Sequence, residues 1–279
     1  LELFIHVCHA IQHAHQKGVI HRDIKPSNIL ITMVDGVPVP KVIDFGIAKA
    51  TGGQLLGDHT VFTAHEQFVG TPAYMSPEQA TLSGLDVDTR SDIYSLGVLL
   101  YELLTGNTPF AQDELLQLGL DEMRRTLLER DPHRPSTRLD GLRTEELTQT
   151  AIQRHVEPRR LKLLLAGDLD WIVMKALEKD RDRRYQTVNG LAADVRRYLN
   201  NEPVTARPPS RVYRLQKLVR RNRTAFAAGT AVVLALALGF GTSTWLFFRE
   251  REARRHQPSG TAGWGIAKPK HASPQASLF

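Results

Sequence analysis

The sequence predicts a mainly α-helical fold with one short β-hairpin, followed by one transmembrane helix. Apolar residues recur at a helical spacing in residues 1–16, and residues 111–167 are charged, rich in Leu and Arg and expected to be helical. Two short apolar runs flank the turn signal Asp35-Gly36, an arrangement typical of a hairpin. From Thr224 onward, 25 consecutive residues carry no charge. This run is long enough to span a membrane, because about 20 residues suffice to cross a bilayer.

Length and composition fit one or two globular domains and exclude a disordered or fibrous chain. The 279 residues are 42% hydrophobic, enough to bury a substantial core. The net charge of +6 is unevenly distributed, since residues 205–279 hold 13 of the 36 Lys+Arg and 2 of the 30 Asp+Glu. These basic residues surround the apolar run, so we expect no nucleic-acid-binding face. The single cysteine, Cys8, can form no intrachain disulfide and favours a reducing compartment.

Residues 1–16 are expected to form the first helix, which Gly18 ends in a left-handed conformation. His6, His9 and His13 share one face of this helix and could bind a metal. No carboxylate or cysteine joins them, so ordinary surface positions are favoured. The chain starts with neither a helix cap nor an initiator methionine. We therefore expect that an N-terminal part of the protein is missing from it.

The loop at residues 21–28 reads His-Arg-Asp-Ile-Lys-Pro-Ser-Asn. It combines the carboxylate of Asp23, the ammonium of Lys25 and the amide of Asn28 within six residues, and Pro26 stiffens the segment between them. These three groups together can address a hydroxyl, a phosphate and a metal ion.

A hairpin with strands at residues 29–32 and 41–43 is expected to follow this loop and to deliver Asp44-Phe45-Gly46. An isolated Asp near a turn is more often a cap than a ligand. Here two loops on neighbouring strands should present Asp23, Asn28 and Asp44 to one space.

These two loops together resemble the marker motifs of the eukaryotic-type serine/threonine protein kinases, in particular the bacterial, membrane-anchored ones. Residues 70–78, Gly-Thr-Pro-Ala-Tyr-Met-Ser-Pro-Glu, are similar to the substrate-docking loop of the family, with Ser76 where alanine is usual. Residues 91–104 resemble the buried central helix of the large lobe, and residues 105–110 close it. The resemblance implies a protein-kinase-like large (C-terminal) lobe.

The resemblance also assigns roles to the loop residues. Asp23 would orient the substrate hydroxyl and accept its proton, and Lys25 would stabilise the transferred phosphoryl group. Asn28 and Asp44 would hold Mg²⁺, with ATP as the phosphate donor, since few oxygen ligands suit this ion. Lys25 and Thr71 point to serine or threonine as the acceptor in a protein substrate.

The polar residues 50–69 fit the mobile activation segment of the family. Thr63, or failing it Thr60, is the candidate phosphorylation site, and Arg22 beside the catalytic Asp could pair with the phosphate. Thr71 is expected to support the active site from within the docking loop instead.

Structural support is expected from two further positions. Ser91 or Asp92 is a natural cap for the central helix. By resemblance, Arg184 pairs with Glu78 of the docking loop, which also contains Thr71 and Pro72. Two last helices of the lobe are expected at residues 169–177 and 187–199, whereas residues 111–167 are predicted as charged helices without readable chemistry.

We expect four segments. They are a partial kinase domain at 1–202, a basic juxtamembrane linker at 203–223, a transmembrane helix at 224–248 and a disordered tail at 249–279. The excess of arginine before the apolar run predicts a single-pass protein whose kinase lobe is cytoplasmic.

A small-residue stripe within the apolar run, Ala231, Ala235 and Gly239, could pair two membrane helices into a homodimer.

The family has a small N-terminal lobe that carries a glycine-rich loop, an ATP-contacting lysine and the glutamate partner of this lysine. None of these has a counterpart before residue 21. The small lobe is therefore expected to be absent from this chain. Two hypotheses remain open, a serine/threonine kinase present as a fragment and a membrane-tethered pseudokinase or scaffold that binds partner proteins without catalysis.

Overall fold

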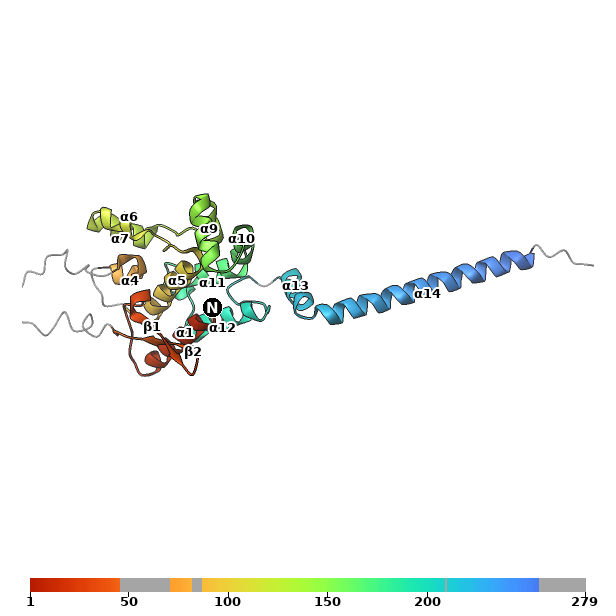
Figure 1. Ribbon diagram of the computed structural model, residues 1–279, viewed down its shortest axis with the longest axis horizontal. Coiled ribbons are helices and arrows are strands. Elements are labelled where there is room, and N and C mark those ends of the chain that lie inside the picture. Colours follow the sequence, from red (N-terminus) through yellow and green to blue (C-terminus); the bar gives the residue numbers. More distant parts are fainter. Residues whose placement is uncertain (46–70, 82–86, 209, 256–279) are drawn as a thin grey trace, which may run out of the picture. The chain divides into compact units, whose positions relative to one another are not determined.

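The computed structural model describes residues 1–45, 71–81, 87–208 and 210–255. It divides into two compact units, Leu1–Arg221 and Asn222–Phe279, each described here by itself (Figure 1). Several predicted features lie outside the described residues: Gly46 and Gly70, the activation segment with Thr60 and Thr63, and the tail beyond residue 255.

The first unit is mainly helical and contains one two-stranded sheet in its described part, which confirms the predicted fold class at this level. Its strands are β1 (Ile29–Val34) and β2 (Val37–Val42), and its short 3₁₀ turns are η1 (Pro26–Asn28), η2 (Pro72–Tyr74) and η3 (Arg181–Arg183). Its helices are α1 (Glu2–Gln16), α4 (Pro77–Ala80), α5 (Thr89–Thr105), α6 (Gln112–Gln117), α7 (Leu120–Glu129), α8 (Pro135–Asp140), α9 (Thr144–Gln153), α10 (Pro158–Leu165), α11 (Asp168–Ala176), α12 (Val188–Leu199) and α13 (Arg211–Arg221).

Helix α5 is the centre of this unit. Thirteen of its 17 residues are buried, so it is enclosed on nearly all sides. It packs against α1, α8, α11 and α12 (Figure 1). Helices α5 and α11 approach each other closely at Gly97, where a Cβ atom would lie 2.8 Å from Cβ of Ala176. A glycine is needed there because any larger side chain would push the two helices apart.

The start of α5 corrects the predicted cap. The helix begins at Thr89, and Asp88 is its N-cap, with its carboxylate accepting a hydrogen bond from the Arg90 amide at 2.8 Å. Ser91 and Asp92 therefore lie inside the first turn. Because Asp88 satisfies the helix end, the carboxylate of Asp92 is available for another task.

The hairpin is longer than predicted, because its strands run up to the turn on both sides. The strands are antiparallel, with Ile29 opposite Val42 and Val34 opposite Val37. Asp35 and Gly36 both have positive φ, 50° and 78°, as a tight two-residue hairpin turn requires. Five large apolar side chains of the hairpin are exposed: Leu30, Ile31, Met33, Val34 and Val37.

The charged helices α6 to α10, whose role could not be read from the sequence, extend the core and support neighbouring loops. Leu115, Leu127 and Leu165 are almost completely buried. Arg124 Nε donates to the carbonyl oxygen of Ala80 at 2.9 Å, and Arg154 Nε donates to that of Leu103 at 3.0 Å. These arginines satisfy carbonyl groups at the ends of α4 and α5 that lack helical partners.

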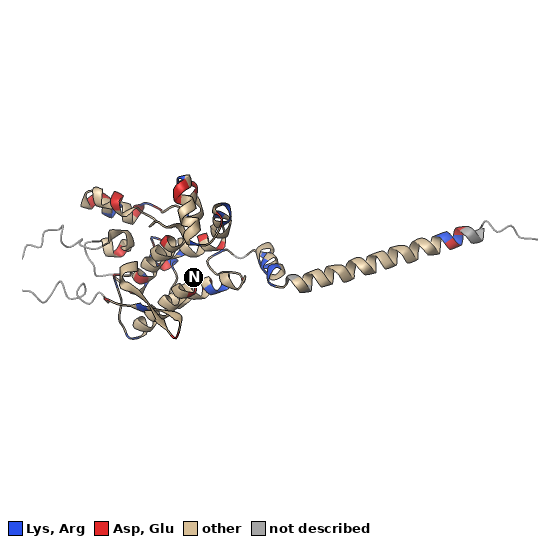
Figure 2. Cartoon of the chain, viewed as in Figure 1, with Lys and Arg blue, Asp and Glu red and all other residues tan. Residues whose placement is uncertain are grey.

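The predicted linker at residues 203–223 includes helix α13, and Tyr213 and Lys217 of that helix are buried. The second unit is helix α14 (Arg223–Arg255), within which Phe226–Glu252 is long and apolar enough to cross a membrane. Figure 2 shows no charged residue along the middle of α14. The helix exposes Leu236, Leu238 and Phe240 by 69% or more.

Candidate active site

The loop at residues 21–28 is held by a carboxylate that is distant in sequence. Asp92, on the first turn of α5, is completely buried. Its Oδ2 accepts from the backbone amide of His21 and its Oδ1 from that of Arg22, both at 2.8 Å. The same Oδ2 lies 2.7 Å from Nε2 of His15 at the end of α1. One buried carboxylate thus joins the first helix, the central helix and the loop.

His21 connects the loop to the hairpin. Its ring is completely buried, its Nε2 lies 3.0 Å from the carbonyl oxygen of Ile43, and its Nδ1 lies 3.3 Å from the amide of Asp23. Both contacts are satisfied at once by the neutral tautomer that carries its hydrogen on Nε2. The ring also stacks on Phe45 at a centroid distance of 4.5 Å.

Asp23, Lys25 and Asn28 converge as the sequence predicts. The Lys25 ammonium lies 2.9 Å from Oδ2 of Asp23. Asn28 Nδ2 donates to the same Oδ2 at 3.1 Å and to the Asp23 carbonyl oxygen at 2.8 Å. The Asp23 and Lys25 side chains remain 23% and 20% exposed, so a substrate can reach them.

The oxygen atoms near this group suit a small hard cation. Because Asn28 uses its amide nitrogen on Asp23, its Oδ1 points elsewhere and has a long 3.5 Å contact from the Ser27 hydroxyl. The amide of Ile43 donates to the Asn28 carbonyl oxygen at 3.0 Å, and Asp44 is the next residue after Ile43. Asp44 is exposed and has a φ of 56°, a left-handed conformation that side chains rarely adopt.

An amide oxygen and a carboxylate fit Mg²⁺, which retains several waters and needs few protein ligands. In the described part of the chain, no group of three or more His, Cys, Asp or Glu side chains is arranged to hold a metal. His6, His9 and His13 are exposed on α1, which agrees with their assignment as surface residues.

Residues 71–79, which include the described part of the predicted docking loop, lie directly against the loop at residues 21–28. Thr71 precedes η2, and Pro72 is buried. Ser76 and Gln79 form a reciprocal cap at the start of α4. Gln79 uses its oxygen in this cap and donates from Nε2 to the Arg22 carbonyl oxygen at 2.8 Å. The two loops are therefore connected by one glutamine side chain.

Glu78 and Arg184 form a buried, bidentate ion pair. Nη1 and Nη2 of Arg184 donate to the two oxygens of Glu78 at 2.7 and 2.8 Å. The Ser91 hydroxyl donates to Glu78 at 2.6 Å. Burial alone would raise the pKa of Glu78, but the arginine and the hydroxyl outweigh it and hold this pKa below its ordinary value.

The remaining donors of Arg184 are also used. They reach the carbonyl oxygens of Glu178, Arg90 and Lys179 at 2.7, 3.0 and 3.1 Å. All five N–H groups of this guanidinium are therefore paired. Tyr74 makes a second attachment of residues 71–79 to α5. The Tyr74 hydroxyl donates to Glu102, and the Ser95 hydroxyl donates to the backbone carbonyl oxygen of Tyr74 at 2.8 Å.

Sequence reasoning missed two residues of this arrangement, His15 and Gln79, and it predicted Ser91 as a helix cap rather than as a donor to Glu78. The spacing Ser76-x-x-Gln79 before a helix is a capping-box pattern and could have pointed to Gln79. Nothing local in the sequence indicates that His15 meets Asp92, 77 residues later. Arg22 is half-buried with a φ of 66°, and the candidate threonines that its side chain was predicted to meet lie outside the described residues.

Comparisons with known proteins agree with the motifs. The sequence matches the family model described as "Protein kinase domain" over residues 2–193. It is 39% identical over 206 residues to the serine/threonine-protein kinase PknB of Mycobacterium tuberculosis and 36% identical to a probable serine/threonine-protein kinase of Streptomyces coelicolor, each match covering 74% of this chain. The chain spans about a quarter of the length of these relatives, 27% and 25%. The crystal structure of the M. tuberculosis PknI kinase domain aligns with 70% of this chain and 53% of its own, at 21% identity and a TM-score of 0.42.

Proposed function

Because this chain belongs to the protein kinase family, we propose that it transfers the γ-phosphoryl group of ATP to serine or threonine hydroxyls of a protein substrate. The observation that carries this proposal is the convergence of Asp23, Lys25 and Asn28 on a loop that Asp92 holds from behind. Phosphoryl transfer requires positioned groups more than covalent chemistry, and this loop supplies them.

In the proposed reaction, Asp23 accepts a hydrogen bond from the substrate hydroxyl and takes its proton as the oxygen attacks the γ-phosphorus. The new O–P bond forms as the bond to the β-phosphate oxygen breaks, and ADP leaves with that electron pair. Lys25, which already lies 2.9 Å from Asp23, stabilises the charge of the group in transfer. Asn28 Oδ1 and the Asp44 carboxylate would hold Mg²⁺, which when bound neutralises phosphate charge.

The acceptor is proposed to be a protein serine or threonine because Lys25 and Thr71 match the Ser/Thr kinases of the family. The loop from Thr71 to Glu78, fixed by Arg184 and Gln79, is the proposed docking surface for the substrate protein.

The test is incubation of the purified chain, extended by any reading frame that continues upstream of Leu1, with labelled ATP, Mg²⁺ and a generic substrate protein. Label is expected on serine or threonine after phosphoamino-acid analysis and is expected to disappear when the metal is chelated. Label confined to tyrosine would contradict the acceptor class, and no label from the extended chain would contradict the activity.

Control by phosphorylation is part of the proposal. We expect a phosphate on Thr63, or failing it on Thr60, to pair with the guanidinium of Arg22 and order the activation segment. Mass spectrometry of the active, full-length protein checks this, and finding neither threonine phosphorylated would refute it.

We propose that the small lobe that grips ATP is supplied from outside residues 1–279. In the described part of the chain the only sheet is the β1–β2 hairpin, and its exposed apolar side chains offer a surface on which further structure could pack. The alternative is a membrane-tethered pseudokinase or scaffold that binds partners without catalysis. A glycine-rich loop and a strand lysine encoded upstream of Leu1 would favour the kinase, and an in-frame stop codon there would favour the alternative.

We propose that α14 anchors the protein in a membrane as a single span, with the kinase lobe in the cytoplasm. The length and apolar composition of Phe226–Glu252 support the span, and the arginine-rich segment before it supports the orientation. Pairing of two spans through Ala231, Ala235 and Gly239 is a further part of this proposal. A Gly239→Leu variant that associates as the wild type does would argue against the pairing.

A further inference from the structure

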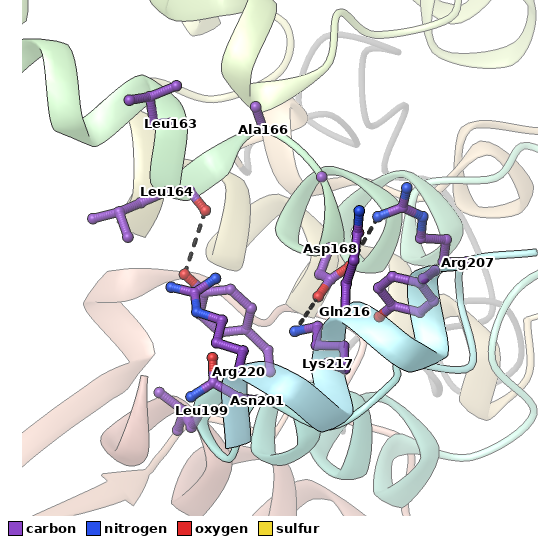
Figure 3. Close-up of a pocket in the computed structure, with 13 residues that line it drawn as sticks. Leu163, Leu164, Ala166, Asp168, Leu199, Asn201, Arg207, Gln216, Lys217 and Arg220 are labelled. Atoms are coloured by element: carbon purple, nitrogen blue, oxygen red, sulfur yellow. Dashed lines mark hydrogen bonds and ion pairs between the residues drawn. The ribbon is translucent and has the colours of Figure 1, made fainter. Parts of the chain in front are cut away.

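Helix α13 has a polar side that is fastened to the kinase lobe. Lys217 Nζ lies 2.6 Å from Oδ2 of Asp168, with the two side chains only 10% and 7% exposed. Arg207 contacts the same carboxylate at 3.5 Å. The Tyr213 hydroxyl accepts a hydrogen bond from the amide of Val204 at 3.0 Å. Figure 3 shows Lys217 and Arg207 directed at Asp168. All three residues line a hollow of about 400 Å³ between the helix and the lobe.

The segment that leads into α13 is also fixed. The completely buried carboxylate of Asp194 accepts from the amides of Thr205 and Ala206 and from the Thr205 hydroxyl, each at 2.8 Å. Burial alone would raise the pKa of Asp194, and these donors together with Arg197 instead hold it below its ordinary value. The start of α13 is therefore part of the lobe and not a free tether.

The other side of α13 is apolar and exposed. Val212, Leu215, Leu218 and Val219 expose 66%, 57%, 43% and 37% of their surface. At about 100° per residue they fall within an arc of roughly 120°, whose centre lies about 180° from that of Tyr213 and Lys217. The usual amphipathic arrangement, with the apolar side toward the core, is thus reversed in this helix.

Basic residues border this apolar side. By the same spacing Arg211 lies within this arc and Arg214 about 40° beyond its edge. Both are exposed, as are Arg220 and Arg221, and the helix contains no acidic residue. A hollow of about 370 Å³ lies along the flank between this side and Lys217. It is lined by Leu215 and Leu218, by Lys217, Arg214 and Arg221, and by Asn201 and Pro203 of the lobe. Aliphatic side chains between arginines are typical of helices that lie in the interface of an anionic membrane.

We propose that the outward side of α13 lies in the headgroup layer of an anionic membrane, so that the kinase lobe is held in a defined orientation at the bilayer. The occupant is identified by charge and by chain order, because α13 ends at Arg221 and the apolar helix α14 begins at Arg223. A second copy of this chain would bring the same arginines together, and like charges oppose that pairing. The proposal rests on the proposed span through α14.

The test uses the full chain in lipid bilayer discs made of phosphatidylcholine alone or mixed with phosphatidylglycerol. An environment-sensitive fluorophore is attached to single cysteines introduced as Val212→Cys or Leu215→Cys. Ile152→Cys on α9 is the matched control, because Ile152 and Val212 are equally exposed at 66%. The native Cys8 is completely buried, and burial raises the pKa of its thiol, so it should not be labelled.

Brominated acyl chains are expected to quench the labels at positions 212 and 215 severalfold more than the label at 152, and only in the discs that contain phosphatidylglycerol. Aqueous iodide is expected to quench in the opposite order. A label on Leu236→Cys, within α14, tests the membrane span independently of the α13 proposal. If position 236 is protected while 212 and 215 are as open to iodide as 152, the α13 proposal is overturned and the span stands.

Two further outcomes are decisive. An iodide-accessible label at position 236 would overturn the span and, with it, the membrane contact of α13. If positions 212 and 215 are equally protected from iodide in both lipid compositions, the proposed requirement for an anionic membrane is overturned.

Discussion

Replacement of Asp23 by asparagine is expected to lower the rate of phosphate transfer by about 10²–10⁴-fold, the range attributed to general acid–base catalysis. The amide has nearly the same shape as the carboxylate and can still accept the hydrogen bond from Asn28, so the loop should keep its conformation. It carries no negative charge and cannot take the proton of the substrate hydroxyl. It also loses the ion pair with Lys25.

The rate is measured as transfer from labelled ATP under saturating substrate, with the free energy of unfolding determined in parallel. Asp35→Asn is the matched control, since Asp35 lies at the tip of the hairpin and asparagine tolerates its positive φ. The control is expected to transfer phosphate at the wild-type rate. Equal rates for the wild type and the Asp23→Asn variant would exclude catalysis at this loop.

The sequence predicts those parts of the site in which the residues are close together along the chain. Asp23, Lys25 and Asn28 lie within six residues, and the short loop around Pro26 leaves few ways to arrange them. The turn at Asp35-Gly36 fixes the register of the hairpin, in which Ile29 lies opposite Val42. Local geometry thus explains why Asp23, Lys25 and Asn28 converge, whereas the membership of Asp44 in the site stays a prediction.

The supporting contacts could not be predicted, because they join distant parts of the chain. Asp92 meets His21 across 71 positions and was instead interpreted as a helix cap. The cap was wrong because Asp88 stands three residues before Ser91 and serves that purpose. No periodicity reveals which buried carboxylate meets which backbone amide, since that depends on how helices pack.

Helix α13 illustrates another limit. Pro203, Pro208 and Pro209 are typical of a linker, and the apolar residues of α13 do not face the core. The helix is fastened to the lobe by Lys217 and Asp168, a polar contact between segments about fifty residues apart. Patterns that identify helices by an inward apolar side cannot identify one that is attached by its charged side.

The Arg184→Ala variant is expected to lose about 3–5 kcal/mol of free energy of unfolding, as is typical when one partner of a buried ion pair is removed. The guanidinium is completely buried and uses all its donors on Glu78 and three carbonyl oxygens. Its removal leaves the Glu78 carboxylate, only 11% exposed, with Ser91 as its remaining side-chain donor. The docking loop should lose its position together with this contact.

Urea unfolding of the detergent-solubilised protein measures this loss, and Arg183→Ala is the control. Arg183 is the preceding residue, its side chain is 69% exposed, and its ion pair with Glu178 should contribute about 0–1 kcal/mol. A double-mutant cycle with Glu78→Gln isolates the pair itself. Losses that add simply in the double variant would show that Glu78 and Arg184 are not coupled.

The dependence of stability on pH provides an independent check of the same pair. Because folding lowers the pKa of Glu78, this carboxylate stabilises the fold above its ordinary value of 4.5, and that contribution is lost as the pH falls through the lowered pKa. The difference in free energy of unfolding between the wild type and the Glu78→Gln variant should therefore shrink on acidification below that value. A difference that stays constant across this window would mean that Glu78 has the same pKa in the folded and unfolded chain, contrary to its bidentate contact with Arg184.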